Sequence, residues 1–249
     1  MMKTIISLLL NKRNLAWGLV FLFAGTLQAQ ELSLTADRTR TEDTQDIEAW
    51  TAVLDQPEDY VRETFDKFIK QEFSFRTEKR AKNILVVPKA KIVEIMALRG
   101  DLRAIITPRG SGTAVSLAFS PGYDIHVNKG TYPDEFTRLS GVAKRYVKFH
   151  YTTYYQELVK DTEKVLRNKQ KDIEKNQSRI GRLKTDIAEN EAKINAGDKN
   201  TPKLTDKNRK AQENISQMEA EIRTWEGEVT KLQETLTKAQ ASVKKVNDY

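Results

Sequence analysis

The chain has 249 residues, of which 39% are hydrophobic and 31% are charged, and its mean hydropathy is −0.62. This composition is too polar for one large globular core and is typical of a chain with much solvated helix. The absence of cysteine excludes disulfides, thiol catalysis, thiolate metal sites and a lipid-anchored lipoprotein.

The first 29 residues have the pattern of a secretory signal peptide. Lys3, Lys12 and Arg13 precede an apolar run over residues 15–27, and cleavage is expected after Ala29. The apolar run is shorter than the ~20 residues that span a bilayer. Loss of these three cations, in a segment without acidic residues, lowers the formal net charge from +7 to +4. We therefore expect export to the periplasm or the cell exterior, which argues against nucleic acid as a partner.

A polar leader followed by a helix is predicted next. Residues 30–56 are mixed in charge, with a short helix expected around Trp50. Pro57 opens a helix that is predicted to reach about Gln71. One face of that helix carries apolar residues at core spacing, namely Val61, Phe65, Phe68 and Ile69.

Strand-like segments then predict a small α+β head over residues 57–150. Residues 84–87, 102–107 and 113–119 are apolar and rich in β-branched side chains, and turn residues 108–112 join the last two as a β-hairpin. Residues 123–127 alternate as a further short strand, whereas residues 91–98 are ambiguous. We expect an antiparallel sheet covered by helices.

Two long helices are predicted to form an antiparallel coiled-coil hairpin over residues 151–249. Pro133 begins the first helix, which can run to residue 196, where Gly197 can cap it. The second helix is expected over residues 202–248, with Thr201 as its cap. A loop as short as residues 197–200 suits a helical hairpin.

One register aligns the two helices. Facing residues of an antiparallel pair have numbers with a constant sum, and a sum of 398 places apolar residues opposite each other and Asn190 opposite Asn208. The predicted seam consists of Val159, Leu166, Ile173, Ile180, Leu183, Ile187, Asn190, Ile194, Leu204, Asn208, Ala211, Ile215, Met218, Ile222, Trp225, Val229, Leu232, Leu236 and Val243. Polar Thr162, Lys169 and Asn176 interrupt the first helix, so we expect the second helix to keep uncovered apolar surface that invites oligomerisation or a client.

No catalytic, cofactor-binding or metal-binding residues are predicted. His126 and His150 are the only histidines, and Asp124 shares a predicted strand face with His126, but no third ligand follows at metal-binding spacing. Packing or surface roles are therefore favoured for both histidines. Residues 110–112 (GSG) lack a nucleotide-binding pattern and are interpreted as a hairpin turn.

Two further groups of residues have a functional and a structural interpretation. A basic stretch could face an anionic membrane or an acidic partner, although a solvated strand face is favoured; it contains Arg76, Lys79, Arg80, Lys82, Lys89 and Lys91. Aromatic residues of the long helix could line a ligand pocket, although anchoring the helix to the head is favoured; they are Tyr146, Phe149, Tyr151, Tyr154 and Tyr155.

The stretch GSGTAVSLAFSPGYDIHVNKGTYPDEF, followed by YYQELV and charged heptads, resembles uncharacterised exported proteins of the Bacteroidetes group. The segment LQAQ at the predicted cleavage site is also similar to theirs. The resemblance implies a small α+β head joined to a C-terminal coiled coil, and it implies no activity. In architecture alone the chain is similar to the Skp-like periplasmic chaperones, from which it departs because its head precedes the hairpin and its C-terminus is helical.

The sequence therefore predicts an exported, non-enzymatic interaction or scaffold protein without cofactors. Its hairpin would bind a protein partner or self-associate, and contact with a membrane surface is not predicted. One alternative is a holdase-type chaperone that grips unfolded clients between hairpins. Another is a ligand-binding head.

Overall fold

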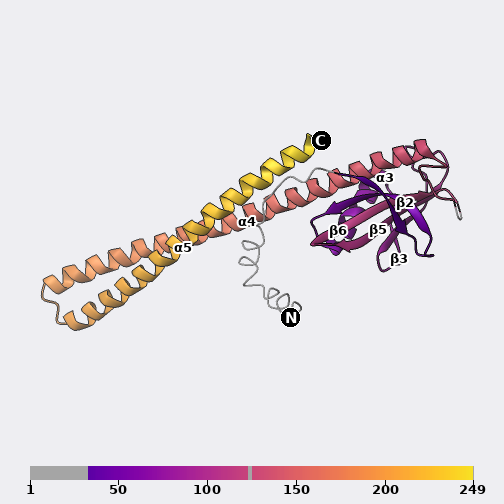
Figure 1. The fold of residues 1–249 in the computed structure, drawn as a ribbon. Coiled ribbons are helices and arrows are strands. Elements are labelled where there is room, and N and C mark those ends of the chain that lie inside the picture. Colours follow the sequence, from indigo (N-terminus) through magenta and orange to yellow (C-terminus); the bar gives the residue numbers. More distant parts are fainter. Residues whose placement is uncertain (1–32, 123–124, 249) are drawn as a thin grey trace. The chain divides into compact units, whose positions relative to one another are not determined.

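The computed structural model describes residues 33–122 and 125–248 and shows an α+β fold with a long helical hairpin (Figure 1). The predicted fold class is confirmed. The predicted signal peptide, residues 1–29, lies outside the described residues. The described chain divides into two units. The head consists of the residues up to Tyr155 together with residues 242–248, and the hairpin unit is Gln156–Ala241.

The head contains a six-stranded antiparallel sheet with strand order β1-β2-β6-β5-β4-β3. The strands are β1 (Thr35–Arg40), β2 (Asp46–Leu54), β3 (Glu78–Ala81), β4 (Ile84–Ala90), β5 (Gly100–Arg109) and β6 (Gly112–Ser120). The described helices are α3 (Glu58–Phe73), α4 (Pro133–Asn195) and α5 (Thr201–Asn247).

The predicted leader is instead the first part of the sheet, and the short helix expected around Trp50 is wrong. Strand β2 pairs with β1 on one side and with β6 on the other, with Trp50 opposite Leu117. Ile47 and Ala49 are buried on one face of β2, whereas Ala52 and Leu54 enter the main core on the other. A strand with two buried faces lacks a simple alternation of polar and apolar residues, and this hid β2 in the sequence.

The β5–β6 hairpin is confirmed, and its strands are longer than predicted. Arg109 pairs with Gly112, so only Gly110 and Ser111 form the turn. Gly110 has a φ of 63°, which suits the first central position of a two-residue hairpin turn. A side chain at Gly112 would put its Cβ 2.2 Å from the carbonyl oxygen of Leu54, so this position requires glycine.

Two other predicted segments differ from the sequence interpretation. The strand expected over residues 123–127 does not form in its described part, because Ile125 makes only an isolated bridge with Gly122. Tyr123 and Asp124 lie outside the described residues. Ambiguous residues 91–98 form a turn that buries Ile92 and Ile95.

The main core lies between the sheet and helices α3 and α4. The predicted face of α3 is buried, and Phe65 and Phe68 pack against Tyr146 of α4 with ring centroids 5.2 and 5.5 Å apart. The last turn of α5 also belongs to the head, since Val246 joins this core and Lys148 Nζ donates a hydrogen bond of 2.9 Å to the Asn247 carbonyl. Residues of the C-terminus therefore complete the head.

In the hairpin unit, α4 and α5 are joined by a short connection in which Gly197 has a φ of 79°. A positive φ at this position is the usual glycine ending of a helix. The helix bounds agree with the sequence prediction within one or two residues. None of the helices in the described part of the chain combines the length and apolar character needed to cross a membrane.

Candidate functional site

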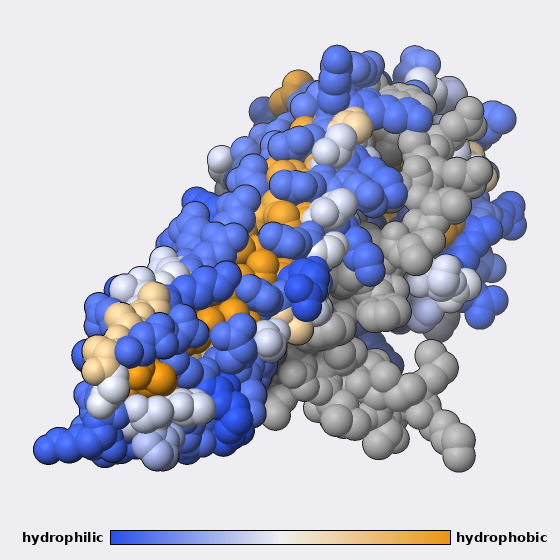
Figure 2. Space-filling model, turned by 90° about the vertical axis from the view of Figure 1, so that its left-hand side faces the viewer, coloured by the Kyte–Doolittle hydropathy of each residue, from blue (hydrophilic) through white to orange (hydrophobic). Residues whose placement is uncertain are grey.

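The residues that the sequence assigned to the hairpin seam are buried or partly buried, and one cluster joins Ile180 of α4 to Ile215, Met218 and Ile222 of α5. Leu166, Ile180, Leu204, Ile215, Met218 and Ile222 are buried, and the remaining members are partly buried. Figure 2 shows apolar side chains in a line along the hairpin with hydrophilic side chains on both sides. The seam therefore has one apolar edge that side chains of the same chain cover only in part.

Polar residues of the seam find partners across it. Asn190 Nδ2 donates a hydrogen bond of 2.8 Å to Asn208 Oδ1. Buried Asn176 donates through Nδ2 to Glu221 Oε2 at 3.1 Å. Asn176 and Asn190 of α4 are therefore each matched by a polar group of α5, as buried polar groups require.

Lys169 forms a charged polar layer. Its Nζ lies 2.7 Å from Glu228 Oε2 and 5.4 Å from the centroid of the Trp225 ring. The ammonium group of Lys169 is thereby paired at the edge of the seam, while its methylene groups can cover apolar surface.

The expected excess of uncovered apolar surface on α5 is wrong in its simple form. Among the described residues, the exposed large apolar side chains are Val53, Val93, Leu98 and Ile125, and none lies in the hairpin. Because Lys169 and Asn176 are paired, α4 covers more of α5 than its sequence suggested. What stays accessible is the partly buried edge of the seam.

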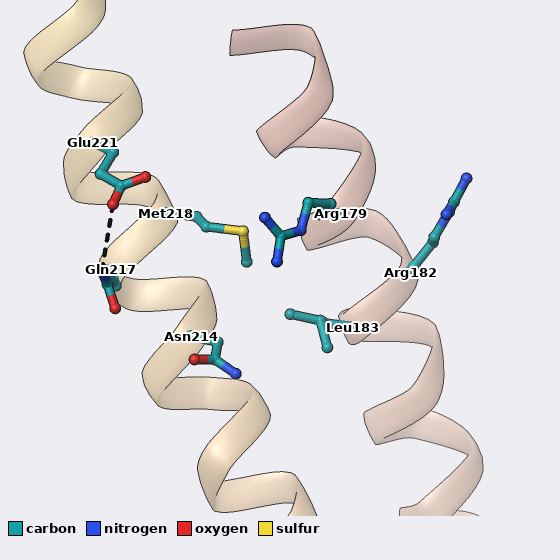
Figure 3. Close-up of a pocket in the computed structure, with 7 residues that line it drawn as sticks. All are labelled: Arg179, Arg182, Leu183, Asn214, Gln217, Met218 and Glu221. Atoms are coloured by element: carbon teal, nitrogen blue, oxygen red, sulfur yellow. Dashed lines mark hydrogen bonds between the residues drawn. The ribbon is translucent and has the colours of Figure 1, made fainter. Parts of the chain in front are cut away.

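This edge opens into a groove of about 400 Å³ between the two helices (Figure 3). Leu183 and Met218 point into it from opposite helices, and Arg179 lies beside Met218. Arg182 points outward from α4. The remaining lining residues are Asn214, Gln217 and Glu221 of α5, and Gln217 Nε2 donates to Glu221 Oε1 at 3.3 Å.

The groove combines apolar groups with two arginines that form no ion pair among the described residues. Among the described residues, neither Arg179 nor Arg182 takes part in an ion pair. The two helices differ in charge around it: residues 160–184 of α4 contain nine basic and four acidic side chains, whereas residues 213–234 of α5 contain six acidic and two basic ones. At the groove itself α4 contributes Arg179 and Arg182, and α5 contributes one carboxylate, Glu221.

A second, polar cleft of about 520 Å³ lies in the head. At its base Arg103 is held between Glu42 (Nε to Oε2, 3.3 Å) and Asp101 (Nη2 to Oδ2, 3.4 Å). Burial raises the pKa of Glu42, but hydrogen bonds from its own backbone N–H and from Arg103 outweigh burial and leave the pKa below its ordinary value. The rim carries the cations Arg80, Lys89 and Arg99.

His126 lies in this cleft without forming a metal site. Its Nδ1 is 2.7 Å from Ser120 Oγ, and its Nε2 is 2.8 Å from Gln45 Oε1. Across the described residues no group of three His, Asp or Glu side chains could hold a metal ion. Sequence reasoning missed this cleft because its residues come from five separate segments, and only the strand alternation of Asp101 and Arg103 could have indicated it.

His150 lies in the core of the head, where its side chain is fully buried. Its Nδ1 is 2.6 Å from Thr64 Oγ1 and its Nε2 is 2.8 Å from Gln56 Oε1. With a carbonyl oxygen beside Nε2, that nitrogen carries the proton and Nδ1 accepts from Thr64. Burial disfavours the charged ring and lowers the pKa of His150 to about 3.

The aromatic residues of α4 pack as an anchor between α4 and the rest of the head. Tyr146 donates a hydrogen bond of 3.0 Å to the Val61 carbonyl of α3, and Phe149 lies 5.6 Å from Phe68. Tyr155 contacts both Tyr151 and Tyr154, and Tyr60 of α3 contacts Tyr154. This arrangement supports the anchoring interpretation over a ligand pocket.

The six residues of the predicted basic stretch, from Arg76 to Lys91, are all exposed. Arg80 pairs with Glu78 at 2.8 Å. Ser111 occupies the β5–β6 turn and has no base beside it among the hydrogen bonds of that turn. These residues therefore form a solvated cationic surface and a structural turn.

Comparison of the chain with models of protein families, with curated proteins and with solved structures gives no match in any of the three.

Proposed function

We propose that this chain is an exported, non-enzymatic interaction protein whose hairpin binds a protein partner or a second copy of itself. The observation that supports this most directly is the hairpin groove, where Leu183 and Met218 lie beside Arg179, which forms no ion pair among the described residues. An apolar centre with a polar, charged rim is the usual composition of a protein interface. Export is inferred from the pattern of residues 1–29.

The head serves as the anchor of α4 in this proposal. Its aromatic cluster and the last turn of α5 fix both helices at the head. The groove lies between the paired helices α4 and α5, so it is ordered before a partner arrives, and this lowers the entropy cost of binding.

A paired deletion tests the proposal without damage to the head. Removal of residues 174–187 together with residues 211–224 takes two heptads from each helix and keeps the sum rule intact for the residues that remain. This deletion removes every residue of the groove. Removal of residues 160–173 together with residues 225–238 is the matched control, because it shortens the hairpin equally and keeps the groove.

The measurement is the size of the assembly that contains the tagged chain in extracts of the native cell, by size exclusion. We expect the control deletion to stay in the same assembly as the intact chain and the groove deletion to elute as the free protein. Equal elution of both deletions would refute the hairpin groove as the association surface.

A ligand-binding head is a second candidate, and the polar cleft around Arg103 favours it. Arg103 is 12% exposed, and its buried Nη1 has no hydrogen-bond partner among the described residues, so it can donate to a small anion or polar ligand. A thermal-shift screen of small carboxylates and phosphates would show stabilisation of the intact chain but not of Arg103→Gln. A flat screen with the intact chain would remove this candidate.

A further inference from the structure

Residues 89–99, the end of β4 and its connection to β5, carry the two most exposed large apolar side chains of the described chain. Val93 is 66% exposed and Leu98 is 62% exposed. Single exposed apolar residues are common on soluble proteins, but two in so short a segment, with a specific charge pattern around them, indicate a binding surface.

The fold holds these two side chains in the solvent. Ile92 and Ile95 of the same segment are buried in the main core, and the Ile95 N–H donates a hydrogen bond of 2.9 Å to the Ile92 carbonyl. Arg145 of α4 forms an ion pair of 2.5 Å with Glu94. The segment is therefore tied to the core and to α4, and the outward direction of Val93 and Leu98 follows from its turn.

Cations flank the two apolar side chains in the sequence. Lys89, Lys91 and Arg99 are exposed, and the only acidic residue within residues 89–99 is Glu94, which is already paired with Arg145. Lys79 and Lys82 of the preceding β3–β4 hairpin add two more exposed cations. Residues 79–99 thus present a cationic surface from which two apolar groups project.

We propose that residues 89–99 bind the surface of an anionic lipid membrane. Val93 and Leu98 enter the boundary between headgroups and acyl chains, while Lys89, Lys91 and Arg99 contact headgroup phosphates. This combination of two exposed apolar side chains and exposed cations in one segment fits a negatively charged surface. The inference concerns the head alone and does not rest on the hairpin as an association surface.

Flotation with lipid vesicles tests this inference on the chain that begins at Gln30, the proposed mature form. We expect binding to phosphatidylcholine vesicles that contain phosphatidylglycerol, weaker binding at high salt, and no binding to phosphatidylcholine alone. Each cation contributes about fivefold to such binding, so the triple variant Lys89→Gln, Lys91→Gln, Arg99→Gln should bind about 100-fold more weakly. The double variant Val93→Ser, Leu98→Ser should lose about tenfold.

The matched control is Lys164→Gln, Lys171→Gln, Lys175→Gln, which makes the same change of charge on exposed residues of the hairpin. Its binding should stay within about twofold of the intact chain. Because the chain has no cysteine, Val93→Cys can carry a single environment-sensitive fluorophore, whose emission should shift to the blue on anionic vesicles. Absence of binding to anionic vesicles, or equal loss in the hairpin control and the triple variant, would overturn the proposal.

Discussion

Asn190 and Asn208 meet across the hairpin through a hydrogen bond of 2.8 Å from Nδ2 to Oδ1. Their numbers add up to 398, the sum that aligns the apolar residues of the two helices. The neighbouring polar contacts keep close to this alignment, with Asn176 bound to Glu221 and Lys169 to Glu228. A pair of amides that satisfy each other in one alignment and not in its neighbours fixes the register of the hairpin.

The register predicts where a disulfide can form. In the cysteine-free chain, the pair Ile187→Cys and Ala211→Cys should oxidise readily, because these positions face each other. The pair Ile187→Cys and Met218→Cys, displaced by one heptad, should stay reduced under the same conditions. Non-reducing electrophoresis distinguishes the two outcomes, and equal oxidation of both pairs would show that the register is not fixed.

Replacement of both asparagines by leucine should stabilise the hairpin and weaken its register. The double variant Asn190→Leu, Asn208→Leu exchanges a polar layer for apolar packing, and we expect the free energy of unfolding to rise by about 1–2 kcal/mol. Thermal unfolding followed by circular dichroism measures the gain. In the same background the displaced cysteine pair should begin to oxidise, and its continued resistance would mean that other layers set the register.

Acid should destabilise the head through His150. The folded protein keeps this ring neutral down to about pH 3, whereas the unfolded chain protonates it near 6.5. The unfolded state therefore binds more protons between these values, and the stability that is present above pH 6.5 is lost as the pH falls, by up to about 1.4 kcal/mol per pH unit. Urea unfolding at pH 7 and pH 5 measures this loss above the range where Glu42 titrates.

His150→Gln is the control for that pH dependence. It should be less stable than the intact chain at pH 7 by about 1–3 kcal/mol, since Thr64 and Gln56 lose their partner. Its stability should change less than that of the intact chain between pH 7 and pH 5. An unchanged pH slope would assign the acid sensitivity to another group.

The C-terminal turn should stabilise the head although it follows the hairpin in sequence. Val246 is buried in the head core, so Val246→Ala should lower the free energy of unfolding by about 1–2 kcal/mol. The exposed neighbour Lys245→Ala should change it by less than about 0.5 kcal/mol. Equal effects of the two substitutions would show that this turn does not pack on the head.

The hairpin could be predicted from the sequence because its order is local. Apolar residues three and four apart, a glycine ending and one constant sum contain the whole pattern, and the Asn190–Asn208 contact follows from it. Strands β1 and β2 could not be predicted in this way. The residues of β1 are polar except for Ala36. Strand β2 is held by pairing with β6, which lies more than 60 residues away in the chain at Thr51 and Ser116.

The candidate sites also differ in how far the sequence could predict them. The apolar groups of the groove, Leu183 and Met218, could be predicted as seam residues from their spacing. That Arg179 forms no ion pair among the described residues depends on side-chain geometry, which residue spacing does not encode. Arg103 meets Glu42 across 61 residues, so the head cleft exists only once the sheet has formed. Exposure of Val93 and Leu98 likewise depends on which residues of their turn reach the core.

Site-specific photo-crosslinking in the native cell tests the hairpin groove as an association surface most directly. A photoreactive amino acid at Arg182, which lines the groove, is compared with one at Gln177, an exposed position of α4 that does not line it. We predict a discrete crosslinked product at Arg182, either to a second copy or to one other protein, and none at Gln177. No product at Arg182, or the same products at both positions, would contradict the proposed function.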